Sequence, residues 1–322
     1  MTAEGLFSAR QVATLTRPQR ADRVRRLMDQ AYTDLDRAIA EHVDADGRRL
    51  VGIVTLFSGG NDSTVLAHLM RPWSTHAAHA NTGIGIEATR QFVRDTCATW
   101  DLPLLERAAP RPEDSYEAHV LAHGFPGPGM HARIYQRLKE RALEQVRREL
   151  VTNGYRERVV YLAGRRRSES ERRSSIPAVE RKDSVVWVSP LVDWTALDMT
   201  TYRLMHAESD PVPLNEVPQR IHMSGECLCG CFAKPGEIDE LAFWFPETVA
   251  YIRDLEARIA DLDIPEHRKR WGWSAYPEAA KRRMKEVAVM AGQIDLFAEL
   301  EPSPAGPLCS DCGPDETGAD RG

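Results

Sequence analysis

No apolar run in the 322-residue chain is long enough to span a bilayer, and no signal peptide opens it. An excess of positive charge is also lacking: the formal net charge is −6, so no global basic field favours a nucleic-acid partner. Hydrophobic residues make up 42% and charged residues 28%, as in an ordinary soluble globular protein. We therefore expect a cytoplasmic protein without a membrane partner.

The chain also lacks the G-x-x-x-x-G-K-[ST] spacing of a Walker loop. It has a different glycine turn, S-G-G-N-D-S-T, at residues 58–64. Apolar residues of 51–57 precede this turn as a short buried strand, and those of 65–70 follow it on one helical face. Glycines let a ligand approach the main chain, and a helix start presents free N–H groups and a positive dipole end. The segment predicts a phosphate-binding site; the alternative is a plain turn with a helix cap.

Hydrophobic periodicity predicts strands and helices that alternate along the chain. The expected strands are 51–57, 75–80, 102–106, 158–163 and 184–189. The other expected helices are 22–43, 87–100, 131–150, 248–262 and 277–292, with irregular segments at 110–130 and 211–236. This alternation indicates an α/β fold with a doubly wound, mostly parallel sheet, in which ligands bind at the carboxyl ends of the strands.

The same patterns divide the chain into four parts. We expect an N-terminal helical segment (1–48), a nucleotide-binding domain (49–236), a helical C-terminal region (237–300) and a disordered tail (301–322). The tail is expected to be disordered because Pro, Gly, Ser and Asp dominate it.

An arginine-rich loop, G-R-R-R-S-E-S-E-R-R, occupies residues 164–173, directly after the strand predicted at 158–163. Guanidinium groups match phosphate or sulfate oxygens through paired hydrogen bonds. A second anion-binding loop at the same sheet edge would hold the far end of a nucleotide or its leaving pyrophosphate. The alternatives are a solvated charge run and a basic patch for RNA.

The six cysteines fall into three groups. Cys97 lies on the apolar face of a predicted helix and is expected to be a small core residue. The segment 227–231, C-L-C-G-C, holds three thiols within five residues, and 309–312 adds a C-x-x-C pair. Four thiolates fit an iron–sulfur cluster or a structural zinc ion; free thiols are the alternative. Three thiols cannot complete such a site, so the fourth ligand must come from Cys309, Cys312 or another residue.

Two of these segments resemble known family motifs. The turn at 58–64 resembles the S-G-G-x-D-S motif of the PP-loop ATP-pyrophosphatase superfamily, whose members often carry Lys where this chain has Asn61. One positive charge near the phosphates is therefore missing. The loop at 164–173 resembles the G-x-R-x-x-E-S-x-x-R segment of the phosphoadenosine phosphosulfate (PAPS) reductase family.

Shorter segments resemble the same family and occur in the expected order between residues 51 and 236. They are Asn81-Thr82-Gly83 with Glu87, Gly124-Phe125-Pro126 followed by Arg137-Leu138-Lys139, and Pro190-Leu191 followed by Trp194. The chain departs from the family at Tyr135, where some relatives carry cysteine. Some members of the family hold a four-iron cluster on cysteines, so the resemblance implies iron–sulfur before zinc.

The resemblance implies an adenine nucleotide alpha hydrolase-like fold and three possible functions. The first is an enzyme that cleaves ATP to AMP and pyrophosphate and so adenylates a substrate for sulfur transfer. The second is a phosphoadenylyl-sulfate (sulfonucleotide) reductase, which uses the same pocket without ATP cleavage. The third, of another class, is a non-catalytic nucleotide- or nucleic-acid-binding partner protein with a structural zinc ion.

The residues expected at the site fall into three groups. Catalytic roles are expected for Asp62, as a ligand of Mg²⁺, and for Arg165 and Glu169. Nucleotide contacts are expected from Ser58, Gly59, Gly60, Asn61, Ser63, Thr64, Gly83, Gly164 and Arg172. Metal ligation is expected from Cys227, Cys229, Cys231 and Cys312. The expected cofactors are ATP or PAPS, Mg²⁺ and a 4Fe-4S cluster, with Zn²⁺ as the alternative. The expected partners are an adenine nucleotide, a sulfur donor protein and a nucleic-acid substrate.

Overall fold

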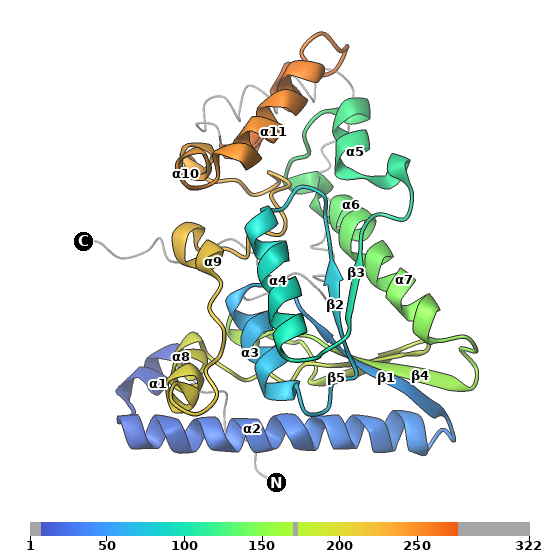
Figure 1. Cartoon of the computed structure of the whole chain (residues 1–322), viewed down its shortest axis with the longest axis vertical. Coiled ribbons are helices and arrows are strands. Elements are labelled where there is room, and N and C mark those ends of the chain that lie inside the picture. The colour runs from blue at the N-terminus through green and yellow to red at the C-terminus, as the bar shows by residue number, and fades with distance from the viewer. Residues whose placement is uncertain (1–7, 170–172, 276–322) are drawn as a thin grey trace.

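A six-stranded sheet lies at the centre of the computed structural model, which describes residues 8–169 and 173–275. Its strand order is β3 (Leu104–Arg107), β2 (His76–Ala80), β1 (Arg49–Leu56), β4 (Glu157–Leu162), β6 (Val185–Val188) and β5 (Val179–Lys182). Neighbouring strands pair in parallel, except that β5 runs antiparallel to β6 at one edge. The predicted doubly wound, mostly parallel α/β sheet is confirmed (Figure 1).

Helices surround this sheet (Figure 1). They are α1 (Ala9–Thr14), α2 (Arg17–Ile39), α3 (Asn61–Met70), α4 (Glu87–Thr99), α5 (Tyr116–His123), α6 (His131–Tyr135), α7 (Arg141–Leu150), α8 (Ala196–His206), α9 (Glu216–Ile221), α10 (Glu237–Trp244) and α11 (Pro246–Arg258). A π-helical turn, Ala40–Asp44, extends α2, and another, Gln136–Glu140, joins α6 to α7. Within the described ranges, no helix is both long and apolar enough to cross a membrane.

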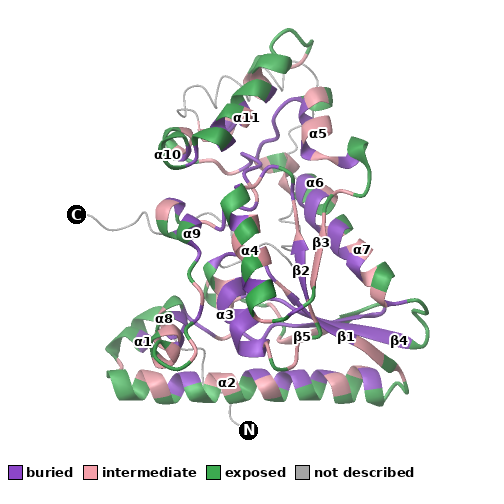
Figure 2. Ribbon diagram, in the orientation of Figure 1, coloured by how far each residue is buried: buried purple, intermediate pink, exposed green. Residues whose placement is uncertain are grey.

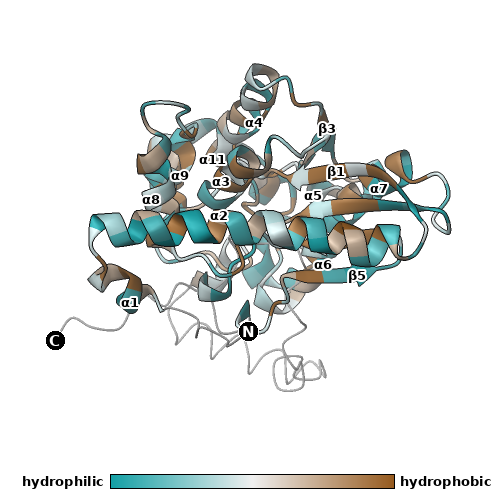
Figure 3. Ribbon diagram, turned by 90° about the horizontal axis from the view of Figure 1, so that it is seen from below, coloured by the Kyte–Doolittle hydropathy of each residue, from teal (hydrophilic) through white to brown (hydrophobic). Residues whose placement is uncertain are grey.

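Helices cover both faces of the sheet. Because successive residues of a strand point to opposite sides, one strand contributes side chains to the core on each face. Val160 and Leu162 of β4 join a core cluster with residues of α2, α3 and α8. Val159 and Tyr161, from the same strand, pack with α7 on the other face. Figure 2 shows β4 as buried, and Figure 3 shows mainly hydrophilic residues on the outward side of α2. The central strands β1 and β4 are neighbours, so the loops that follow them emerge side by side at the carboxyl edge.

A second core lies beyond that edge, among α5, α6, α9, α10 and α11 (Figure 1). Ile134, Leu138 and Leu228 are among its fully buried side chains. This core packs the segment around the three cysteines against the helix that starts at residue 131. Cys97 lies elsewhere, in the small cluster between α3, α4 and β2, and is buried as predicted.

Some elements differ from the sequence-based expectation. Residues 110–130 are not irregular throughout, because Ser115 caps α5 by accepting a hydrogen bond from the N–H of Ala118. The segment 211–236 likewise contains the short helix α9. Strand β5 and helices α8 and α10 were not predicted. The expected helix at 277–292 and the tail at 301–322 lie outside the described residues.

Candidate functional site

The predicted phosphate-binding turn connects β1 to α3. No side chain in the described part of the chain caps α3 at Gly60, so its first N–H groups are available to a ligand. The hydroxyl oxygens of Ser58 and Ser63 lie 3.0 Å apart. Ser63 is buried and also donates its hydroxyl to the Gly60 carbonyl, at 3.1 Å, and the buried Thr64 donates to the same carbonyl at 2.7 Å. The turn therefore presents main-chain donors and the Ser58 hydroxyl, whereas the hydroxyls of Ser63 and Thr64 support the helix start.

Gly59 has a φ of +80°, a conformation that favours glycine. A Cβ atom added there would lie 2.7 Å from Cγ2 of Thr89 and 3.2 Å from Cγ2 of Val93. The absence of a side chain lets the turn lie directly against α4. The Gly59 carbonyl accepts a hydrogen bond from the Asn215 amide at 2.9 Å, which also holds the turn in place.

We expect Gly59→Ala to lower the free energy of unfolding by roughly 2 kcal/mol or more, because backbone strain and overpacking add at this position. Gly47→Ala is the matched control, since Gly47 has a φ of +60° but nothing within 4 Å of its Cβ position. That control should lose only about 1 kcal/mol, the strain contribution alone. Urea denaturation measures both values. Equal losses in the two variants would show that the contact with α4 does not restrict residue 59.

The arginine loop lies against this turn. A Cβ atom on Gly164 would be 3.5 Å from the Ser63 nitrogen and from the Asp62 carbonyl carbon, so the loops after β4 and β1 are in contact. The two loops are therefore neighbours, as the sequence predicted. Arg166 donates its Nε hydrogen to the Asp62 carboxylate at 2.6 Å, a contact that the sequence did not predict.

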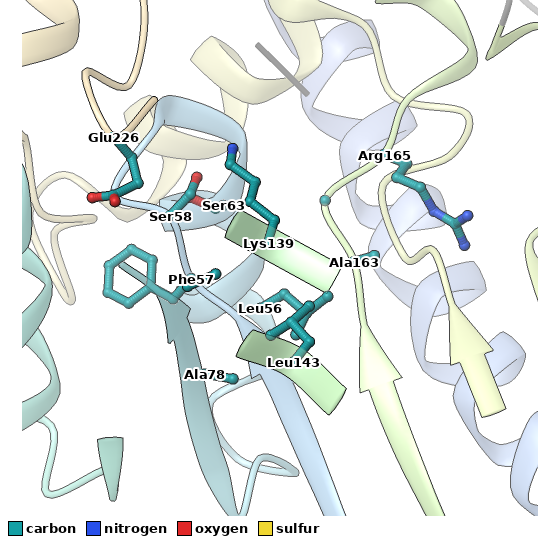
Figure 4. A pocket seen from close by; sticks show the side chains of 12 residues that line it. Leu56, Phe57, Ser58, Ser63, Ala78, Lys139, Leu143, Ala163, Arg165 and Glu226 are labelled. Atoms are coloured by element: carbon teal, nitrogen blue, oxygen red, sulfur yellow. The ribbon is translucent and has the colours of Figure 1, made fainter. Parts of the chain in front are cut away.

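Arg165, the expected catalytic arginine, is buried and turns away from the serines (Figure 4). Its Nε donates to the Ser189 hydroxyl at 3.0 Å and its Nη1 to Glu180 at 2.8 Å. Its Nη2 is buried and has no hydrogen-bond partner among the described residues. Two guanidinium nitrogens therefore anchor the side chain to β5 and to the residue after β6, and the third is enclosed by protein.

Glu169 and Asp62 form a hydrogen-bonded carboxyl pair beside the turn. Burial and the hydrogen bond to Asp62 raise the pKa of Glu169 to about 9, although Arg173, its ion-pair partner, acts in the opposite direction. Arg166, which donates to Asp62, also lies 3.6 Å from a carboxylate oxygen of Glu169. Arg172, the other expected arginine, lies outside the described residues.

The raised pKa of Glu169 gives a pH-dependent stability. Between the unfolded pKa of 4.5 and the folded value of about 9, the native state binds the extra proton, so parent stability falls as pH rises. Glutamine mimics the protonated carboxyl at every pH. We expect the free energy of unfolding of Glu169→Gln to be close to that of the parent near pH 5. Between pH 5 and pH 9 the variant should become more stable than the parent, by at most about 1.4 kcal/mol per pH unit. Urea denaturation at several pH values tests this, and a pH-independent difference would contradict it.

A pocket opens between the two loops (Figure 4). Ser58, Ser63, Gly164, Arg165, Lys139 and Glu226 supply its polar lining. Lys139 comes from the π-helical turn after α6, and such turns are frequent at functional sites. It supplies a cation to the pocket that Asn61 of the turn does not. The sequence offered a signal for Lys139 in the Arg137-Leu138-Lys139 match, but did not place it beside the turn.

Glu226 is fully buried and joins this pocket to the loop after β2. It accepts hydrogen bonds from the Thr82 N–H at 2.8 Å and from Nε2 of His79 at 3.0 Å. Burial alone would lower the pKa of His79, but Glu226 and the Phe57 carbonyl outweigh it, so the pKa is raised. Gly83, an expected nucleotide contact, lies in the same loop, with a φ of +75°.

The three predicted metal ligands that lie within the described residues are neighbours in the structure. A histidine that the sequence did not indicate lies next to two of them. Ligand atoms of His131, Cys229 and Cys231 all lie within 4.8 Å of one another. The thiols of Cys227 and Cys231 are hydrogen-bonded to that of Cys229. His131 begins α6, almost a hundred residues earlier in the chain, at a spacing that no simple metal motif has. Cys312 lies outside the described residues.

Side chains from distant elements hold the cysteine segment in shape. Tyr116 of α5 donates its hydroxyl to the Cys229 carbonyl at 2.9 Å. Trp271 donates its indole N–H to the Leu228 carbonyl at 2.7 Å. Gly230, with a φ of +77°, turns the chain between Cys229 and the next cysteine. These contacts hold the backbone of the segment in which the Cys229 and Cys231 thiols are buried, as outer-shell hydrogen bonds do for metal ligands.

The model of the phosphoadenosine phosphosulfate reductase domain family matches residues 52–216. Among solved structures, the chain is similar to phosphoadenylyl-sulfate (PAPS) reductase from Candida auris, with 17% identity, a TM-score of 0.42, and coverage of 64% of this chain and 92% of that one. It is also similar to Candida glabrata FMN adenylyltransferase in complex with FAD and inorganic pyrophosphate, with 13% identity, a TM-score of 0.42, and coverage of 62% and 60%. No curated protein matches it. The family match spans more than half of the chain, which therefore belongs to the phosphoadenosine phosphosulfate reductase domain family of the PP-loop superfamily of nucleotide-binding enzymes.

Proposed function

We propose that this enzyme binds an adenine nucleotide at the turn 58–64 and cleaves ATP to AMP and pyrophosphate, adenylating a substrate that then accepts sulfur. The observation that carries the proposal is the convergence of three kinds of anion donor on one pocket. These are the uncapped N–H groups of α3, the Ser58 hydroxyl and the Lys139 ammonium. Such a convergence suits a departing pyrophosphate, whose charge rises as the bond breaks.

The carboxyl pair supports ATP, which is used with Mg²⁺, over a metal-independent substrate. Asp62 and Glu169 offer the oxygen ligands that Mg²⁺ prefers. A divalent cation held there would neutralise charge on the leaving phosphates. Arg166 orients the Asp62 carboxylate.

The reductase alternative requires a nucleophilic thiol at the nucleotide. No cysteine lines the pocket within the described ranges. Cys229 and Cys231 are buried beside His131 instead. Cys309 and Cys312 lie outside those ranges, so the reductase function stays the second candidate.

The arginine loop gives little support to a nucleic-acid surface. Arg165 and Arg166 bind carboxylates, and Arg167 pairs with Asp193 and donates to the Ile176 carbonyl. Arginines that are committed to internal acids in this way are not a solvated basic patch. The non-catalytic alternative is therefore the least supported of the three.

For the metal, the iron–sulfur interpretation stays a prediction, but the observed geometry favours its zinc alternative. Thiolates on one zinc ion lie about 3.8 Å apart, because each Zn–S bond is about 2.3 Å in a tetrahedral site. The ligand atoms of His131, Cys229 and Cys231 all fall within 4.8 Å. In a 4Fe-4S cluster, each thiolate binds a different iron corner, which separates the thiolates more widely. With Cys227, whose thiol is hydrogen-bonded to that of Cys229, the donors would number three cysteines and one histidine, which is a common structural zinc set.

The experiment that tests the enzymatic function is product analysis after anaerobic purification. The protein is incubated with ATP and Mg²⁺, and separately with PAPS and a thiol reductant, and the products are separated by chromatography. AMP and pyrophosphate would support ATP cleavage, whereas sulfite and the bisphosphate nucleotide would support the reductase. Neither product, even with candidate acceptors present, would refute both.

A further inference from the structure

Two segments of the chain each carry both a candidate metal ligand and a wall of the nucleotide pocket. The first is the continuous helix of α6 and the π-helical turn, with His131 at its start and Lys139 about two turns later. The second is the cysteine segment, in which Glu226 directly precedes Cys227. Lys139 and Glu226 both line the pocket (Figure 4).

We propose that His131 completes a single-ion site with Cys227, Cys229 and Cys231, and that the ion couples this site to the nucleotide pocket. The coupling rests on the proposed nucleotide function, whereas the ligand assignment does not. The spacing of three of these donors, His131, Cys229 and Cys231, fits Zn²⁺. Cys227, whose thiol is hydrogen-bonded to that of Cys229, is the adjacent fourth donor.

The ligand assignment follows from the surroundings of the thiols. Cys229 and Cys231 are buried, and their neighbours within reach are other thiols and His131 rather than apolar side chains alone. Thiolates need a positive partner, and an ion shared with a neutral imidazole gathers four donors that lie on two separate segments. His131 thus takes the place that sequence reasoning left to Cys312 or another residue.

The coupling follows from what the ion would cross-link. It fixes the start of the α6 helix to the cysteine segment, so the distance between Lys139 and Glu226 across the pocket is fixed as well. Glu226 is in turn bound to the Thr82 N–H and to His79, which holds the Phe57 carbonyl just before the phosphate-binding turn. Without the ion, this direct link between the two walls is lost, and the apolar core around them remains. A nucleotide that requires both walls in place then binds more weakly.

Thermodynamic linkage makes this coupling reciprocal. We expect zinc removal to weaken nucleotide affinity by about 5–150-fold, the usual range for coupled sites. The nucleotide should slow zinc loss in the same way. Neither effect needs a direct contact between the two ligands.

The first experiment tests the ligand. Zinc and iron are measured by mass spectrometry in the parent, in His131→Ala, and in His131→Cys, which can restore a fourth donor. His123→Ala is the matched control, because His123 is an exposed histidine on α5. We expect zinc to be lost in His131→Ala, retained in His131→Cys and unchanged in the control. Stoichiometric zinc in His131→Ala, or iron with acid-labile sulfide in the parent, would overturn the single-ion site.

The second experiment tests the coupling. Calorimetry measures the affinity of α,β-methylene-ATP with Mg²⁺, first for the zinc-loaded parent and then for protein freed of zinc by a chelator. The rate at which a chromogenic chelator removes zinc from the folded parent, with and without the analogue, needs no stable metal-free protein. Equal affinities, or equal removal rates at saturating analogue, would refute the coupling. If the zinc-loaded parent binds no analogue, the proposed nucleotide function fails together with the coupling, and the His131 result stands alone.

Discussion

Replacing Asp62 by alanine is expected to lower the rate of ATP cleavage by about 100–1,000-fold, the usual effect of removing one preorganised electrostatic contact. Asp62 starts α3 beside the phosphate-binding turn, and its carboxylate is one of the two oxygen groups suited to Mg²⁺. The fold should survive the change. Once Asp62 is absent, Glu169 can ionise and pair with both Arg166 and Arg173, which already lie next to it.

The measurement is AMP release at saturating ATP and Mg²⁺, with circular dichroism to confirm the fold. Asp210→Asn is the matched control, because Asp210 also pairs with an arginine, Arg71, at 2.6 Å, but contacts His68 near the end of α3 rather than the phosphate-binding turn. The control should cleave ATP at the parent rate. If Asp62→Ala keeps the parent rate, the proposed role of Asp62 in holding Mg²⁺ is wrong, whatever binds at the turn.

The parts of the site that the sequence predicted are those held within one contiguous segment. The strand, the glycine pair and the helix of residues 49–70 are adjacent in the chain, so local pattern is enough to recognise them. The approach of Gly164 to Ser63 was also foreseen, because neighbouring parallel strands deliver their loops to one edge.

The parts that the sequence missed depend on tertiary contacts. Lys139 and His131 lie on a helix whose place beside the site depends on tertiary packing, through the second core and through the contact of α7 with the sheet, which no local pattern reveals. The roles within the arginine loop were also ambiguous, because successive residues of an extended chain point in opposite directions. Arg165 therefore points towards Glu180, and Arg166 points towards Asp62. The sequence alone is equally compatible with the opposite assignment of the two arginines.

The missed secondary structure has a similar cause. Strand β5 has the sequence V-E-R-K, which carries little apolar signal because it is a half-exposed edge strand that pairs only with β6. Helix α5 was hidden among the prolines and glycines that surround it. Its N-terminus is fixed by the Ser115 cap, and Tyr116 is buried by contact with the cysteine segment. Such elements owe their stability to tertiary packing rather than to propensity.

Replacing Cys229 by serine is expected to remove most of the bound metal, with an affinity loss greater than the roughly 100-fold that outer-shell changes alone can reach. Cys229 lies at the centre of the cluster, hydrogen-bonded to the thiols of both neighbouring cysteines. A serine hydroxyl has nearly the same size but does not ionise to replace a thiolate. The metal content of purified protein and the midpoint of thermal unfolding should fall together, because the ion joins two segments of the second core.

Cys97→Ser is the matched control for that experiment. Cys97 is also buried, and burial raises the pKa of its thiol to about 12, so it stays a neutral core side chain. Its replacement can lower stability through packing, but the metal content should remain that of the parent. Loss of metal in both variants would indicate general unfolding rather than lost ligation. Full metal content in Cys229→Ser would show that Cys229 is not a ligand, and that the three thiols meet for a purely structural reason.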